Sequence, residues 1–390
     1  MITIARHNPF EFGGELKASS LIDREHELDL VVRTLEAGGK LFLIGPRRYG
    51  KTSILAAAED KLSQSALVVL RYDAEVYEDL GRLAAALLAG AAKQLTPTLE
   101  KAGEAIKRFA SRLKPRVEYD LTEQSLSITL GDSDKSDSKA LPMLTDVLNI
   151  IDKLAAQAGR RAAVILDEFQ QIIEAGGVNA EKQIRGTIQR HHHTGYVFAG
   201  SKTRMLADMT NDPARAFWKL GSRLFLGPIP RPVWQEFLTS GFTKSGFKVQ
   251  PESLERLLDA AEDVPFNIQQ LANACWEQLR ASGGGTLTPN RVVAALVILV
   301  TRENPSYTQL WNSLNQPHKK VLRAVIDESG TKLRSAEILA RYGVASSTMH
   351  KTLKILDHRG IIREEETIGA IRYRLEDPFF AAWLRQVQAG

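Results

Sequence analysis

The segment from Gly45 to Thr52 reads Gly-Pro-Arg-Arg-Tyr-Gly-Lys-Thr and constrains the fold more than any other part of the chain. It satisfies the pattern G-x-x-x-x-G-K-[ST], in which the glycines let the backbone wrap its N–H groups around phosphate oxygens. An apolar stretch, Leu41 to Ile44, precedes it, and a helical pattern follows from Thr52. Because such a loop joins a buried strand to a helix N-terminus, this context favours a nucleotide site over a chance glycine-rich turn.

The positions of this loop have separate expected roles. We expect the ammonium group of Lys51 to reach the β- and γ-phosphates, and the hydroxyl of Thr52 to bind Mg²⁺. The N-terminus of the following helix adds a favourable dipole for anionic groups. The predicted ATP contacts are Gly45, Pro46, Arg47, Arg48, Tyr49, Gly50, Lys51, Thr52 and Ser53.

A second motif, Ala162-Ala-Val-Ile-Leu-Asp-Glu-Phe169, supplies two acidic residues directly after an apolar strand. Open α/β sheets bind ligands at the carboxyl ends of their strands, where Asp167 is expected to join the Mg²⁺ and nucleotide site. Glu168 is the candidate general base that polarises the attacking water. Alone, this pattern is more often a strand end with solvated acids, but its place after a phosphate loop favours catalysis.

The order of elements predicts an α/β fold with a parallel sheet. Apolar strands alternate with helical patterns as far as Pro228, and residues 117–130 alternate as a hairpin does. After Pro228 the pattern is helical only, and a small α+β module begins near residue 305. We therefore expect a nucleotide-binding α/β domain at 1–229, a helical lid at 230–304 and a C-terminal domain at 305–390. The strands are expected at 41–44, 66–72, 162–166 and 195–199, and the helices at 21–37, from 52, 78–95 and 141–158.

The C-terminal module has the order of a winged helix, with three helices followed by two strands. The helices are expected at 317–328, 335–342 and 346–358, and the strands at 361–366 and 370–375. From Trp311 to Gly390 there are 13 basic and 9 acidic residues, so this region holds most of the chain's net charge of +5. A basic excess suits a polyanionic partner.

Polar and basic side chains of the third helix and the wing are the candidate contacts to double-stranded DNA. They are Ser346, Ser347, Thr348, His350, Lys351 and Lys354 on the helix, and Arg363, Arg372 and Arg374 on the wing. Against DNA binding stand Glu364, Glu365 and Glu366 in the same wing. Winged helices also dock proteins or act as autoinhibitory modules, so that alternative stays open.

Five segments together resemble the archaeal-type ATPase family of the AAA+/STAND superfamily. They are GPRRYGKTS, LDEFQ, FAGSK, NPFEFG and LIDREHEL, and the resemblance runs from about Asn8 to Arg385. It implies a P-loop AAA+ core with a parallel sheet, a helical lid and a C-terminal winged helix-turn-helix. It also implies that residues 8–27 lie beside the adenine.

The resemblance assigns two further catalytic residues beside Lys51 and Glu168. Ser201, at the end of the GYVFAGS strand, matches the polar sensor that detects the γ-phosphate. Arg223, in the GSRLF segment, matches the arginine that reaches into a neighbouring subunit's site, although a solvated arginine at a domain edge is an equal alternative. The stretch 263–270 lacks the lid arginine of many AAA+ proteins, which favours tight nucleotide binding with slow turnover.

The expected function is an ATP-binding and ATP-hydrolysing switch that assembles as a homo-oligomer and engages DNA by its winged helix. The alternative is a STAND-like signalling ATPase whose winged helix docks a protein or autoinhibits. A more remote alternative is a nucleotide-binding scaffold without turnover. Deciding between the first two requires a test of DNA binding by the C-terminal module.

Several remaining features argue for an ordinary cytoplasmic protein. The longest apolar run, Val292 to Val300, has nine residues where a membrane span needs about 20, so we expect no membrane partner. Cys275 is the only cysteine, which fits a reducing cytoplasm. The run His191–His193 is expected to be a loop before a strand rather than a metal site, because consecutive side chains diverge. The five tryptophans are expected in helical cores.

Overall fold

The computed structural model describes residues 7–109, 116–120, 125–129, 140–177, 179–367 and 370–389. The chain forms two compact units. One is Glu15–Gly227, and the other combines the segment up to Gly14 with Pro228–Gly390. The sequence-based division placed all of residues 1–229 in one α/β domain, whereas residues 8–12 pack with the helices that follow Pro228.

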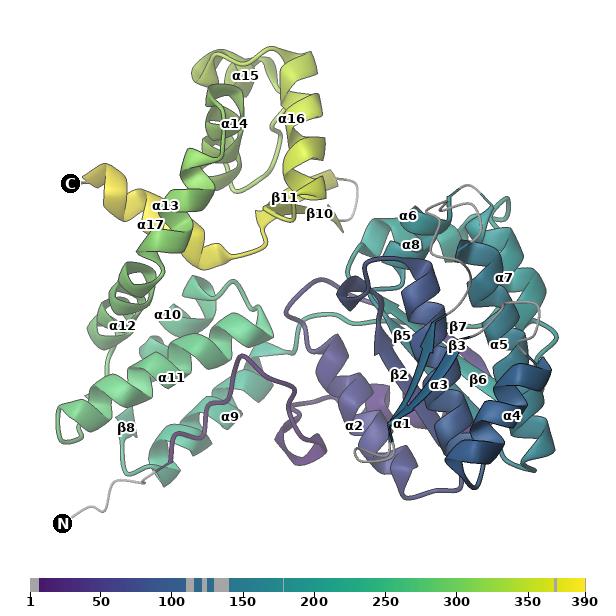
Figure 1. Cartoon of the computed structure of the whole chain (residues 1–390). Helices are drawn as coiled ribbons and strands as arrows, with labels where there is room; N and C mark the ends of the chain where they lie inside the picture. Colours follow the sequence, from purple (N-terminus) through teal and green to yellow (C-terminus); the bar gives the residue numbers. More distant parts are fainter. Residues whose placement is uncertain are drawn as a thin grey trace. The chain divides into compact units, whose positions relative to one another are not determined.

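The unit Glu15–Gly227 is built on a parallel sheet of five strands in the order β2-β5-β6-β1-β7. Helices lie around this sheet in Figure 1. Alternate residues of each central strand face opposite sides of the sheet. Phe42, Val164 and Phe198 lie in the large core with the helices of one face, while Leu43 and Val197 are equally buried on the other. Both faces are therefore covered, as the sequence predicted. The strands are β1 (Lys40–Ile44), β2 (Val68–Asp73), β5 (Ala162–Asp167), β6 (Thr194–Gly200) and β7 (Ser222–Phe225).

Eight α-helices of the described residues surround this sheet. They are α1 (Glu25–Glu36), α2 (Lys51–Ser63), α3 (Leu80–Leu95), α4 (Leu99–Phe109), α5 (Ala140–Gln157), α6 (Gln170–Gly176), α7 (Ala180–Ile188) and α8 (Thr203–Asn211), with short 3-10 turns at Ala18–Ser20 and Ala74–Val76. Helix α1 contacts β1, β6 and α2, whereas α3 contacts α5 and β2. The expected hairpin is present as β3 (Arg116–Asp120) paired antiparallel with β4 (Ser125–Thr129), and β4 contacts α3.

The end of this unit is fixed by contacts to its own interior. Arg24 is buried, with 6% of its surface exposed, and its Nη2 donates a 2.6 Å hydrogen bond to the carbonyl of Gly227. The backbone N–H of Leu226 donates to the carbonyl of Ile44 at 2.7 Å. The chain therefore leaves the sheet beside β1, the strand that leads into the loop at residues 45–52.

The second unit begins with four helices: α9 (Arg231–Lys244), α10 (Pro251–Ala260), α11 (Pro265–Ala281) and α12 (Pro289–Arg302). Trp234 and Trp276 are buried in this helical segment, and so is the single thiol of Cys275. The ring of Phe10 packs 4.6 Å from that of Phe242, and Asn273 Nδ2 donates to the Phe10 carbonyl at 2.7 Å. These contacts attach the N-terminal segment to the helices.

One expectation for this segment was wrong, because it is not purely helical. Strand β8 (Lys248–Val249) pairs in parallel with β9 (Thr286–Leu287). Each strand has only two residues, which is too short to produce the alternation that identifies a strand in a sequence. The described helices include none that is long and apolar enough to cross a membrane.

The C-terminal module has the predicted winged-helix order. Its elements are α13 (Asn304–Asn312), α14 (Gln316–Asp327), α15 (Ala336–Tyr342), α16 (Ser346–His358), β10 (Ile362–Thr367), β11 (Ala370–Leu375) and α17 (Pro378–Ala389). Helix α17 was not predicted. It packs on α13, where the ring of Trp383 lies 5.8 Å from that of Tyr307 and the Tyr307 hydroxyl donates to Asp377 at 3.0 Å. Of the five tryptophans, Trp218 and Trp311 are only half-buried.

Candidate nucleotide-binding site

The sheet order brings the two predicted motifs to one edge. Strand β6 lies between β1, which leads into the loop at Gly45, and β5, which ends at Asp167. All three run in parallel, so their carboxyl ends meet at the same edge. Gly200 ends β6 and places Ser201 between the loop and the acidic pair. The sequence motifs are thus neighbours because of the topology.

The predicted phosphate-binding loop contains two residues whose backbone is in the left-handed region. Arg48 has a φ of 67° and Gly50 a φ of 89°, and α2 begins directly afterwards without a side-chain cap on its first N–H groups. Helix starts of this kind bind phosphate. A Cβ at Gly45 would lie 2.8 Å from the Cβ of Leu226, so this position has room only for glycine.

Lys51 lies inside the loop, with 5% of its surface exposed. Its Nζ donates to the carbonyls of Gly45 and Pro46, both at 2.9 Å. The ammonium charge is therefore held at the centre of the loop. Among the other predicted contacts, Tyr49 and Ser53 are buried, and the Ser53 hydroxyl accepts a hydrogen bond from the Leu16 N–H at 3.2 Å.

The two arginines of the loop lie on its outer side. Arg47 and Arg48 are both exposed. Arg47 forms an ion pair with Glu75, in which Nη2 and Oε1 are 3.5 Å apart. This exposed pair makes a small contribution to stability, so it leaves the Arg47 guanidinium free to exchange Glu75 for a phosphate.

Thr52 and Asp167 meet across the site. The Thr52 hydroxyl donates a 2.9 Å hydrogen bond to Asp167 Oδ2, and Asp167 is 3% exposed. Burial raises the pKa of the Asp167 carboxyl, while the Thr52 hydrogen bond and the Lys51 charge act in the opposite direction. A hydroxyl beside a carboxylate is a pair of hard oxygen ligands, which is the donor set that Mg²⁺ prefers.

Glu168 is held in a distinctive position by its neighbours. Its φ is +48°, and its N–H donates to Asp167 Oδ1 at 2.9 Å. The Ser201 hydroxyl donates to Glu168 Oε2 at 2.8 Å, and the side-chain amide of Gln170 donates to the same oxygen. The sequence placed Glu168 and Ser201 in the site and missed Gln170, which follows in the same Leu-Asp-Glu-Phe-Gln segment.

Arg223 lies on β7, the edge strand next to β1. Its side chain is exposed, and its hydrogen bonds go to the carbonyl of Thr210 at 3.5 Å and to Asn211 Oδ1. Both partners lie at the end of α8 rather than in the phosphate-binding loop. The structure therefore does not bring Arg223 into the site of its own chain.

The three consecutive histidines diverge. His191 is buried, and its ring nitrogens lie 2.7 Å from the Tyr196 hydroxyl and 3.1 Å from Asn149 Oδ1. Burial lowers the pKa of His191 to about 4, while His192 and His193 are exposed. Within the described residues there is no cluster of three or more His, Cys, Asp or Glu side chains suited to a metal ion.

Helix α16 presents most of its predicted polar residues on its outer face. Ser346, Ser347, His350, Lys351 and Lys354 are exposed and Thr348 is half-buried. Its apolar face, which includes Met349 and Leu353, is buried in the module. In addition, Arg334 Nη2 lies 2.8 Å from His350 Nδ1, which brings a further cation to this face.

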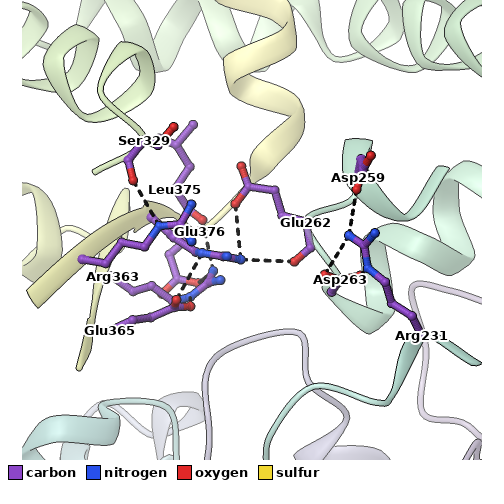
Figure 2. A network of polar contacts seen from close by, with 11 residues as sticks. Arg231, Asp259, Glu262, Asp263, Ser329, Arg363, Glu365, Leu375 and Glu376 are labelled. Atoms are coloured by element: carbon purple, nitrogen blue, oxygen red, sulfur yellow. Dashed lines mark hydrogen bonds and ion pairs between the residues drawn. The ribbon is translucent and has the colours of Figure 1, made fainter. Parts of the chain in front are cut away.

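The wing corrects part of the predicted DNA surface. Arg363 is 6% exposed, with Nε bonded to Glu365 at 2.9 Å and Nη1 to the Leu375 carbonyl at 3.0 Å, so it cannot reach DNA from this position (Figure 2). Arg374 is half-buried and pairs with Glu365 at 3.1 Å and with Glu262 at 3.6 Å. Glu365, counted from the sequence as an obstacle to DNA, instead neutralises these arginines.

The third wing arginine keeps some exposure. Arg372 is half-buried, and its Nε donates to the Ser329 carbonyl at 3.0 Å. Near the wing, Arg231 of α9 forms ion pairs with Asp259 and Asp263, both at 2.8 Å (Figure 2). Asp263 and Glu262 both have positive φ, at 58° and 49°. The loop after α10 is therefore anchored on one side by Arg231 and on the other by Arg374.

Comparison with known proteins supports the same architecture. Residues 305–386 match the family described as "Probable winged helix domain". A search of curated proteins found no match.

Three solved structures are similar over nearly the whole chain. The Walker-type ATPase PABY2304 of Pyrococcus abyssi has 19% identity and a TM-score of 0.62, covering 97% of this chain and 99% of its own. The Aeropyrum pernix ORC2 protein in its ADPNP–ADP complexes has 15% identity and a TM-score of 0.55, with both chains covered completely. The Aeropyrum pernix ORC1 protein in complex with DNA has 14% identity and a TM-score of 0.51, covering 96% of this chain and 94% of its own.

These likenesses confirm the predicted fold class. The similarity to the first two structures extends over 97% and 100% of this chain, so it includes both compact units. The chain therefore shares its fold with the Walker-type ATPase of Pyrococcus abyssi and the ORC2 protein of Aeropyrum pernix, and its residues 305–386 match a winged-helix family.

Proposed function

We propose that this chain binds ATP with Mg²⁺ and hydrolyses it. The contact that carries the proposal is the 2.9 Å hydrogen bond from the Thr52 hydroxyl to Asp167 Oδ2, because it joins the two predicted motifs at one point. Lys51 lies in the same loop and Glu168 follows Asp167 directly. A cation, two hard oxygen ligands and a carboxylate base are the parts that phosphoryl transfer to water requires.

Each residue has a defined part in this reaction. Lys51 exchanges its loop carbonyls for phosphate oxygens and neutralises their charge. Thr52 and Asp167 would hold Mg²⁺, which when bound offsets charge on the phosphates. Glu168 accepts the proton of the attacking water, and the Ser201 hydroxyl beside it responds to the γ-phosphate.

We further propose that Arg223 acts on the nucleotide of a neighbouring copy in a homo-oligomer. Its exposure, and its place on the edge strand β7, support a role across an interface rather than within its own site. A guanidinium stabilises charge spread over the transferring phosphoryl oxygens. The likeness to ORC2 of Aeropyrum pernix, whose structure holds ADPNP and ADP, agrees with nucleotide binding by this fold.

Engagement of double-stranded DNA by the winged helix is the finer part of the proposal. The exposed face of α16, with Lys351, Lys354 and His350, supports it, and the similar ORC1 structure is a complex with DNA. The wing arginines Arg363 and Arg374 are excluded from the proposed surface because they are engaged within the chain.

A second candidate function is a signalling ATPase whose winged helix docks within the chain or on a protein. The contact from Arg374 Nη1 to the carbonyl of Glu262, 3.3 Å long, favours it because it ties the wing to the helical segment. The two functions can be told apart by one measurement: the first requires that the C-terminal module binds duplex DNA, and the second does not.

The central test of hydrolysis is phosphate release by the full chain and by Glu168→Gln. We expect the variant to bind ATP and Mg²⁺ normally and to turn over about a hundredfold more slowly, since an amide cannot accept the proton. Turnover by Glu168→Gln at the wild-type rate would show that another group is the base.

A further inference from the structure

Gln170 lies two residues after Glu168, and its side chain returns toward that residue. It begins α6 and is 1% exposed. The N–H of Phe169 donates to the Ala199 carbonyl at 2.8 Å, and the Phe169 ring lies 4.5 Å from that of Phe198. The segment from Glu168 to Gln170 is thus fixed to β6, so the position of the Gln170 amide is set by the fold.

Gln170, Glu168 and Ser201 form a closed triangle of side chains. The Gln170 Nε2 donates to Glu168 Oε2 and lies 3.4 Å from the Ser201 hydroxyl oxygen. The Ser201 hydroxyl donates to the same Glu168 oxygen at 2.8 Å. Two donors therefore hold Oε2, and neither of them uses Oε1.

The carbonyl oxygen of the Gln170 side-chain amide, Oε1, lowers the stability of the fold, and tight packing alone would not require an amide here. Its Oε1 is buried and makes no hydrogen bond to the described part of the chain. It lies so close to Gly200 that a Cβ there would be 2.2 Å away. A buried acceptor without a partner lowers stability, and an apolar side chain of the same length would fill this space at no such cost. The favourable contribution of Gln170 therefore comes from its amide N–H₂ group, which donates to Glu168.

We propose that Gln170 is a positioning residue for the hydrolytic base. It holds the Glu168 carboxylate through Oε2 so that Oε1 is the oxygen that accepts the proton of the attacking water. The inference rests on the proposed function, because it assigns Gln170 a role only through Glu168. The proposal also explains why position 200 is glycine, because a larger residue there would collide with the Gln170 amide.

Gln170→Met tests the proposal, because methionine keeps the length of the side chain but donates no hydrogen bond. We expect kcat to fall about tenfold, less than for loss of the base itself, with KM for ATP unchanged. The melting temperature should stay level or rise, because the unpaired oxygen is removed. Gln171→Met, on the next position of the same helix and only half-buried, is the matched control and should leave kcat unchanged.

The same substitution on a Glu168→Gln background separates positioning from packing. With the base removed, Gln170→Met should cause no further loss in single-turnover phosphate release, since the two residues act as one unit. An equal loss in both backgrounds, a raised KM, or an unchanged kcat in the single variant would overturn the proposal. Gln170→Leu provides the same comparison if the methionine variant does not fold.

The outcomes also separate this proposal from the proposed function. If Glu168→Gln hydrolyses ATP at the wild-type rate, both fail, because Gln170 then has no base to position. If Glu168→Gln is slow and Gln170→Met is as fast as the wild type, only the role of Gln170 is overturned.

Discussion

Thr52 and Asp167 lie 115 positions apart in the chain, and the hydroxyl of one donates to the carboxylate of the other at 2.9 Å. Burial raises the Asp167 pKa, so the folded protein resists its ionisation when no cation is near. The ionised carboxylate is therefore more stable at this position when a cation is bound beside it than when the protein is free of ligand. Replacing Asp167 with a neutral residue should therefore raise the stability of the nucleotide-free protein and lower its affinity for Mg²⁺.

Asp167→Asn should raise the melting temperature of the nucleotide-free protein at pH 7. An acid whose pKa is raised by folding favours the folded state at low pH, and that contribution is lost as pH rises through the raised value. The advantage of the variant should therefore shrink as the pH falls toward the ordinary carboxyl range. Thermal melts of both proteins across pH, without Mg²⁺, measure this, and an advantage that grows at low pH would contradict it.

The same variant should lose the effect of Mg²⁺ on nucleotide affinity, because an amide oxygen is a weaker ligand than a carboxylate. Calorimetric titration with a non-hydrolysable ATP analogue, with and without Mg²⁺, measures the difference. Asp146→Asn, at an exposed position of α5, is the matched control. Equal Mg²⁺ dependence in wild type and Asp167→Asn would remove Asp167 from the metal site.

Lys51→Ala should weaken ATP binding by about a hundredfold, because charge-assisted hydrogen bonds contribute about 1.5–3 kcal/mol each. The exposed Arg47 and Arg48 cannot replace a cation that lies inside the loop. Calorimetry provides the measurement, with Lys61→Ala near the exposed end of α2 as the control. An affinity equal to that of the wild type would reject the assigned site.

Arg223→Ala should keep ATP binding and lose hydrolysis if the arginine acts across an interface. Mixing it with Lys51→Ala is the sharper test, because one junction then pairs an intact pocket with an intact arginine. Partial recovery of phosphate release on mixing is the expected result. Normal hydrolysis by Arg223→Ala alone would leave this residue as a solvated arginine at the sheet edge.

The double substitution Lys351→Ala with Lys354→Ala should weaken duplex binding and flatten the plot of log affinity against log salt by about two. Each lysine is expected to neutralise one phosphate from the exposed face of α16. Lys244→Ala with Lys248→Ala removes the same charge from exposed positions elsewhere and should leave the slope unchanged. Absence of duplex binding by the wild-type chain at low salt would favour the signalling function instead.

The phosphate-binding loop and the acidic pair could be predicted because each follows an uninterrupted apolar strand. Leu41 to Ile44 and Ala162 to Leu166 are buried on both faces, so their patterns are strong, and parallel strands place their ends together. Three helices of the winged-helix module, α14, α15 and α16, were also predictable, and Gly343 and Gly360 follow the last two of them in left-handed conformations.

The burial of Arg363 and the position of Gln170 depend on contacts that a local sequence pattern does not show. Strand alternation would place Arg363 on the wing as readily outside as inside, and only Glu365 and the Leu375 carbonyl decide that it is buried. Gln170 resembles any polar residue at a helix start, and its place beside Ser201, 31 positions away in the sequence, follows only from the fold. Tertiary partners, not propensity, determined both positions.

The contacts at the end of the α/β unit limit where the chain can bend. Leu226 is bonded to the carbonyl of Ile44 and packed against Gly45, and the Gly227 carbonyl is held by the buried guanidinium of Arg24. The backbone is therefore held as far as Gly227, and the ring of Pro228, the next residue, fixes one of its own two torsions. Any displacement of Leu226 would therefore also disturb Gly45, the first residue of the predicted phosphate-binding loop.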